Sequence, residues 1–92
     1  MATGKVRNLA RESGVSVIMT AMAAGDVLEE HSAPGVVTVQ VLRGRVRLFA
    51  DGNEVELKPG QLVMLQPNVP HKHQADTEAV VLLTVTGASG GG

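Results

Sequence analysis

Residues 60–73 read GQLVMLQPNVPHKH, and the interpretation of the whole chain starts from this stretch. Gly60 directly follows a proline, which predicts a turn. Leu62 to Leu65 is an uninterrupted apolar run of strand length. Pro67 and Pro70 have no backbone N–H to donate to a central ladder, so they predict a bend between two strands. The stretch therefore predicts a turn, a strand, a bend and the start of a second strand.

The second strand begins with two histidines, His71 and His73, which are two residues apart. Side chains alternate between the faces of a strand, so we expect both imidazoles on the same face. Two imidazoles at the mouth of a β structure are the strongest chemical signal in the sequence. An alternative for His73 is a solvent-exposed histidine between Lys72 and Gln74.

The other segments of the chain also have strand character, and no segment of ordinary helix length shows a helical period. Valine is frequent, which favours strands. Arg43-Gly44 and Asp51-Gly52-Asn53 are hairpin signals. The expected strands cover residues 15–22, 36–42, 45–50, 54–58, 62–65 and 79–86. Short strands separated by frequent turns predict an all-β protein, an antiparallel double-sheet jelly-roll β-barrel.

Alternation along the expected strands indicates which residues face the core. In residues 36–42, Val37, Val39 and Val41 form the more apolar face and Gln40 lies on the other. In residues 54–58, we expect Val55 and Leu57 to point inward. The strand at 15–22 also carries apolar groups on a second face, Ile18 and Met22, which we place on the outside. Met19, Met22 and Met64 offer flexible packing for a ligand-binding barrel, or are ordinary core residues.

The chain divides into three expected parts: a leading arm or strand at 1–14, a barrel at 15–86, and a Gly-rich tail at 87–92. With 92 residues, the chain is long enough for one small domain and one core. No apolar run of membrane-spanning length and no leader segment is present, so we expect a cytoplasmic protein that does not bind membranes.

Composition excludes several function classes. The chain contains no cysteine, which rules out disulfides, thiolate metal sites and thiol nucleophiles. Net charge is −1 and Phe49 is the only residue among Phe, Tyr and Trp, so we expect no nucleic-acid binding. A small domain without disulfides often depends on a partner subunit for stability, and we expect a homodimer.

The spacing of three glycines and two histidines resembles the two sequence motifs of the cupin family. Gly25, His31 and Gly44 are in register with the first motif, and Gly60 and His71 with the second. The resemblance covers about residues 25–85.

Several motif positions hold other residues. Ala33 stands at the second-histidine position, Val37 at the glutamate position, and Ala75 at the last position of the second motif. Gln66 replaces the motif proline. Asn68 replaces the motif glycine, a tolerable exchange where a positive φ is needed.

The resemblance implies a jelly-roll barrel whose motif side chains hold one metal ion in the interior, typically iron, manganese, nickel, zinc or copper. His31 and His71 occupy two of the four ligand positions. The candidate third ligand is His73, which shares the face of His71, or Glu29, which shares parity with His31. Alternatively, Glu29 is a charged loop residue at the rim of the barrel.

Two functions follow from this site. In the first, a metal on His31, His71 and His73 binds a small molecule and supports oxygenase-like or isomerase-like chemistry as a Lewis acid or redox centre. In the second, the barrel binds or senses a small molecule without metal, and the histidines act as hydrogen-bonding groups. Ala33 and Val37 make the cavity larger and drier than a four-ligand site, which suits an apolar or mixed ligand.

Overall fold

The computed structural model describes residues 5–30 and 34–87, and these residues form nine strands and no helix. The strands are β1 (Lys5–Glu12), β2 (Val15–Met22), β3 (Val27–Glu30), β4 (Val37–Arg43), β5 (Val46–Ala50), β6 (Asn53–Leu57), β7 (Leu62–Leu65), β8 (His71–Ala75) and β9 (Ala79–Thr86).

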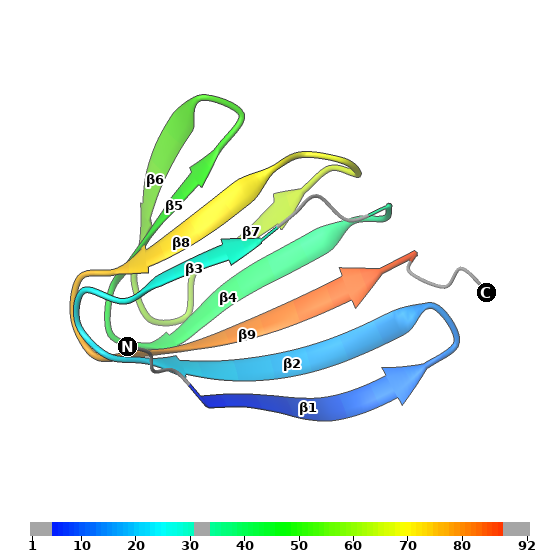
Figure 1. Ribbon diagram of the computed structural model, residues 1–92, viewed down its shortest axis with the longest axis horizontal. Helices are drawn as coiled ribbons and strands as arrows, with labels where there is room; N and C mark the ends of the chain where they lie inside the picture. The colour runs from blue at the N-terminus through cyan, green and yellow to red at the C-terminus, as the bar shows by residue number, and fades with distance from the viewer. Residues whose placement is uncertain (1–4, 31–33, 88–92) are drawn as a thin grey trace.

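Two antiparallel sheets face each other. One has five strands in the order β1-β2-β9-β4-β7, and the other has four in the order β3-β8-β5-β6 (Figure 1). Every strand pair is antiparallel. Consecutive strands repeatedly change sheets, as in a jelly roll. The predicted fold class, an all-β double-sheet jelly-roll barrel, is confirmed.

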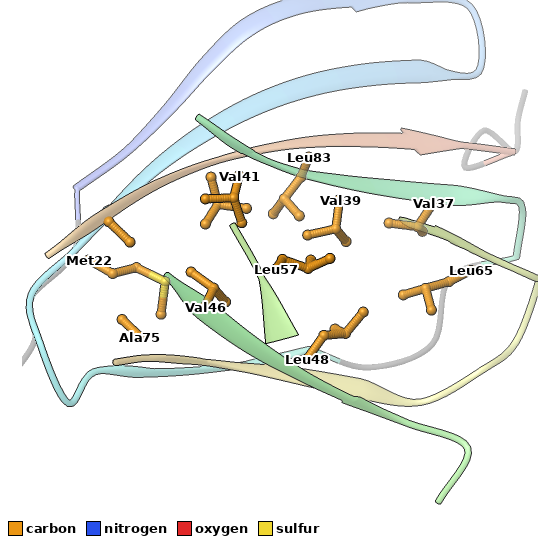
Figure 2. Close-up of a cluster of buried hydrophobic side chains, with 12 residues drawn as sticks. Met22, Val37, Val39, Val41, Val46, Leu48, Leu57, Leu65, Ala75 and Leu83 are labelled. Carbon is orange, nitrogen blue, oxygen red and sulfur yellow. The ribbon is translucent and has the colours of Figure 1, made fainter. Parts of the chain in front are cut away.

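The core lies between the sheets and is formed by every second side chain of the strands. Val37, Val39 and Val41 of β4 are buried, as predicted, while the intervening Thr38 and Gln40 are only partly covered. The buried apolar side chains meet in one cluster from both sheets (Figure 2). Its members are Met22, Val37, Val39, Val41, Val46, Leu48, Leu57, Leu65, Ala75, Ala79, Val81 and Leu83.

The two expected hairpin turns have different outcomes. Asp51 and Gly52 have φ values of 51° and 78°, which suits a two-residue hairpin loop, and β5 does pair with β6. The expected hairpin at Arg43-Gly44 is wrong. β4 and β5 lie in different sheets, so this turn crosses from one sheet to the other. A register shift between Val41 and Arg43 interrupts the ladder with β9 just before this turn.

The predicted facing of β2 is also wrong. Met22 is buried and Ile18 packs against the core, so the even-numbered residues point inward. Val17 and Met19 lie on the outer face instead. Both faces of β2 are rich in apolar residues, so the sequence gives no contrast by which to choose between them.

Two further side chains expected in the core are exposed. Val55 is 42% exposed because β6 is an edge strand, in a hairpin that projects from the body of the molecule (Figure 1). Met64 is 56% exposed because only Val63 and Leu65 of β7 face inward. The irregular segment after Gly25 begins with a short strand, β3, that the sequence did not predict.

At the amino-terminal side, β1 pairs with β2 through a register shift between Asn8 and Ala10. The described residues of β1 from Val6 onward are exposed. The division into arm, barrel and tail stays a prediction, and most of the Gly-rich tail lies outside the described residues.

Candidate functional site

Strand β8 places both of its histidines inside the barrel. Its burial alternates from His71 to Ala75: His71 is 5% exposed and His73 is 0% exposed, whereas Lys72 between them is exposed. The shared face predicted for the two imidazoles is confirmed. The alternative of a solvent-exposed His73 is wrong.

Neighbouring strands cover His73 with apolar side chains. β8 lies between β3 and β5, and His73 is in register with Leu28 on one side and Leu48 on the other. Leu48 is buried and Leu28 packs against the core cluster. His73 therefore lies in an environment that strongly disfavours an ionised ring.

The proline bend before β8 fixes His71. Asn68 within the bend has φ 65°, which explains why asparagine can stand at the motif glycine position. Nδ1 of His71 lies 3.1 Å from the carbonyl oxygen of Val69. A carbonyl oxygen only accepts, so Nδ1 donates this hydrogen bond, and in the neutral form of this ring the lone pair is on Nε2. Histidines that bind metals commonly use a backbone carbonyl in this way.

The two rings form a close pair. Their centroids are 5.2 Å apart and their planes are inclined at 49°. Burial, and then the charge of a protonated His71, lower the pKa of His73 from 6.5 to about 4. His73 is therefore neutral at physiological pH, and neutral imidazole is the form that binds a metal.

The ring nitrogens of His73 have no hydrogen-bond partner among the described residues. A neutral imidazole has one N–H donor and one acceptor nitrogen, and leaving either unsatisfied in a protein interior costs free energy. Both atoms are available to a group that the described residues do not provide.

In the described part of the chain, no third metal-ligating side chain joins His71 and His73. Within residues 5–30 and 34–87, no three His, Asp or Glu side chains form a group able to hold a metal. Glu29 is exposed and is in register with the exposed Lys72, so it lies on the outer face of the sheet, and its candidacy as an interior ligand is wrong. His31 lies outside the described residues, and its predicted role stays a prediction.

The two described histidines are of a type that fits a metal ion. His71 and His73 supply two buried imidazoles on one strand face. First-row transition metals accept imidazole ligands. A third donor would have to come from His31 or from a ligand.

Another interior polar group was not anticipated from the sequence. Thr20 is 2% exposed, between the inward-facing Ile18 and Met22, and its hydroxyl has no hydrogen-bond partner among the described residues. Alternation puts Thr20 on the face of β2 that does not carry Val15, Val17, Met19 and Ala21. We expected that face to point outward, and if it had been assigned to the core, Thr20 would have been recognised as a buried hydroxyl.

The fold and the paired interior histidines define a small jelly-roll barrel with a polar site inside an apolar lumen. The family model described as Cupin domain matches residues 18–86. The chain belongs to the cupin family. A comparison with curated proteins finds no match.

Solved structures of low sequence identity share the fold. A cupin superfamily protein from Desulfitobacterium hafniense DCB-2 is 18% identical with a TM-score of 0.87, covering 91% of this chain and 77% of that one. The Cupin_2 domain of an XRE family transcriptional regulator from Enterobacter cloacae is 20% identical with a TM-score of 0.82, covering 91% and 96%.

A third similar structure is part of a larger enzyme. Salicylate 1,2-dioxygenase from Pseudoaminobacter salicylatoxidans is 16% identical with a TM-score of 0.82, covering 90% of this chain but only 25% of that one. At these identities the likeness establishes the fold alone. In the described part of this chain, no helix has the length and apolar character needed to cross a membrane.

Proposed function

We propose that this cupin is a metal-binding barrel that takes up a small molecule in its interior, with His71 and His73 as two of the metal ligands and His31 as the third. The observation that supports it most is His73: a fully buried, neutral imidazole with no hydrogen-bond partner among the described residues. A buried polar group of this kind requires a partner, and a metal ion satisfies it through a nitrogen lone pair.

His71 supports the same proposal from the neighbouring position. Its Nδ1 donates to Val69, which fixes the ring and, in the neutral form of the ring, leaves the lone pair on Nε2. When bound, a divalent iron, manganese, nickel, zinc or copper ion would supply Lewis acidity or a redox centre. The chain itself supplies two buried imidazoles on one strand face, with apolar side chains beside His73. An oxygenase-like or isomerase-like reaction belongs to this proposal.

A metal-free binding or sensing barrel is the second candidate, and Val37 favours it. Val37 is at the position where the family has a glutamate ligand, and it is 2% exposed within the apolar core. This interior therefore has fewer donors than a four-ligand site. In that case His73 and Thr20 would serve as hydrogen-bonding groups for a small ligand of mixed polarity. Its similarity to the cupin domain of a transcriptional regulator is compatible with such a role.

Elemental analysis separates the two functions. Protein purified without a histidine tag is expected to contain a stoichiometric transition metal, or to bind one from added salts after dialysis. Protein that contains none and binds none of the five metals would contradict the metal proposal and favour the metal-free barrel. A cytoplasmic location stays a prediction from the sequence.

We also propose that the protein is a homodimer formed through the outer face of the five-stranded sheet. Apart from Arg43 at the end of β4, the outward positions on β2, β4, β7 and β9 bear no charge: Val15, Val17, Met19, Ala21, Thr38, Gln40, Leu42, Leu62, Met64, Val80, Leu82 and Thr84. Leu62 is 52% exposed and Met64 is 56% exposed. The outer face of the other sheet bears ion pairs instead, which suits contact with water.

A further inference from the structure

A hollow lies at one end of the barrel, away from the histidines. Its volume is about 310 Å³, and it is lined by Ala21, Met22, Ala23, Arg43, Glu78, Ala79 and Val80. Met22 and Ala79 are buried and form an apolar floor. Arg43 and Glu78 are exposed charged residues at its walls. The hollow is therefore apolar within and bears one charge of each sign.

Hydrogen bonds between turns hold the walls of this hollow in place. The Arg45 backbone N–H donates to the Thr77 hydroxyl at 3.1 Å, and the Asp76 N–H donates to the Arg45 carbonyl at 3.0 Å. These bonds join the turn that contains Arg43 to the turn that contains Glu78. Gly44 tightens the junction: it has φ 81°, and a Cβ there would collide with the carbonyl oxygen of Glu78.

The third wall is fixed in the same manner. The turn after β2 is joined to β8, because the Gly25 N–H donates to the Ala75 carbonyl at 2.8 Å and the Ala75 N–H donates to the Asp26 carbonyl at 2.9 Å. Ala23 in this turn lines the hollow. The hollow is thus preformed by three connected turns, which lowers the entropy lost when a ligand binds.

Neither charge at the walls takes part in an ion pair among residues 5–30 and 34–87. Arg45 pairs with Glu56 at 3.6 Å, and Arg47 pairs with Asp76 at 3.0 Å and Glu54 at 3.5 Å. Among the described residues, Arg43 and Glu78 form no ion pair, with each other or with another group. Arg43 and Glu78 both line the hollow, and since they form no ion pair with each other, their charges are available to a ligand.

We infer that this hollow binds a small zwitterion with an apolar side chain, of the α-amino acid class. The guanidinium of Arg43 would receive the ligand carboxylate, since this pairing matches planar donors with planar acceptors. Glu78 would accept hydrogen bonds from the ligand ammonium group. The floor of Met22 and Ala79 would cover the apolar side chain. A volume near the lower limit for ligand sites fits a molecule of this size.

The test is a nuclear magnetic resonance titration of the full chain with L-leucine. We expect saturable shifts in the backbone amides of Ala23 and Val80. Arg43→Gln and Glu78→Gln should each weaken binding at least about tenfold, as expected for loss of a hydrogen bond between charged groups. The matched control is Arg45→Gln, which removes a neighbouring arginine outside the hollow and should leave the affinity unchanged.

Two analogues test the two charges separately. Leucinol lacks the carboxylate and N-acetyl-L-leucine lacks the ammonium group, so both should bind at least about tenfold more weakly than L-leucine. The inference is overturned if L-leucine produces no saturable shift. It is also overturned if either analogue binds as tightly as L-leucine, or if the Arg43→Gln protein keeps the original affinity while the fold is intact by its amide spectrum.

Discussion

The imidazole rings of His71 and His73 lie inside the barrel with their centroids 5.2 Å apart. They reach this position because they are two residues apart on a strand whose inward positions are all buried. Two protonated rings at this distance would repel each other in an apolar surrounding. The folded protein is therefore more stable while His73 is neutral, and this has a measurable consequence.

We expect the free energy of unfolding to fall in acid because of His73. Its pKa is about 4 in the folded protein and 6.5 for an unperturbed histidine, so the unfolded chain binds the proton more readily. The stability contribution is fully present above pH 6.5 and is lost as the pH falls toward 4. The total loss is about 3 kcal/mol. Urea unfolding of chelator-treated protein at several pH values between 7.5 and 4 measures it.

The control for this prediction is His73→Leu, which replaces the imidazole by an apolar side chain. Carboxylates also titrate near pH 4, so the comparison between the two proteins isolates the histidine. The variant should lose clearly less stability than the original between pH 6.5 and 4.5. Equal losses in the two proteins would mean that His73 is not the group responsible.

We expect Thr20→Val to increase the stability of the protein. The Thr20 hydroxyl is buried and unpartnered among the described residues, and valine has nearly the same shape without the polar atom. Removing an unsatisfied buried group should raise the free energy of unfolding by about 1–2 kcal/mol. Urea denaturation measures the change.

The matched control is the same substitution at Thr86, whose hydroxyl donates to the Val36 carbonyl at 2.7 Å. Thr86→Val removes a formed hydrogen bond and should lower the stability by about 1 kcal/mol. If Thr20→Val destabilises the protein as much as Thr86→Val does, the Thr20 hydroxyl has a partner in solution.

We expect sedimentation velocity to give a homodimer at micromolar protein concentration. Leu82 lies near the middle of the uncharged outer face, so Leu82→Glu places a charge in the proposed interface and should give a monomer. Gln74→Glu, on the outer face of the other sheet, is the control and should leave the dimer intact. A monomeric original protein would rule out the proposed assembly.

The sequence correctly predicts the inner face of β4 and the hairpin between β5 and β6, because in each case the local residues favour one arrangement clearly. The β4 residues alternate valine with polar side chains, and Asp51-Gly52 permits positive φ at both loop positions. The facing of β2 was predicted wrongly because Val17 and Met19 compete with Ile18 and Met22. When both faces of a strand are apolar, hydropathy does not show which face points to the core.

The candidate site was predicted in part for a similar reason. Parity along β8 places His71 and His73 together, and the structure agrees. Glu29 was proposed as a ligand because it shares parity with His31, and Glu29 faces outward. The sheet crossing at Gly44, which builds the hollow at one end of the barrel, depends on contacts between residues distant in sequence. No local pattern contains that information.

The most direct test of the metal proposal is the change in melting temperature on adding manganese, iron, nickel, copper or zinc at neutral pH. A metal that binds only the folded chain should raise the melting temperature. His31→Ala, His71→Ala and His73→Ala should each abolish the rise, and the double variant His71→Ala with His73→Ala should lose no more than either alone. A rise that survives in the folded His73→Ala and His71→Ala proteins, or no rise with any of the five metals, would contradict a metal centre built on these histidines.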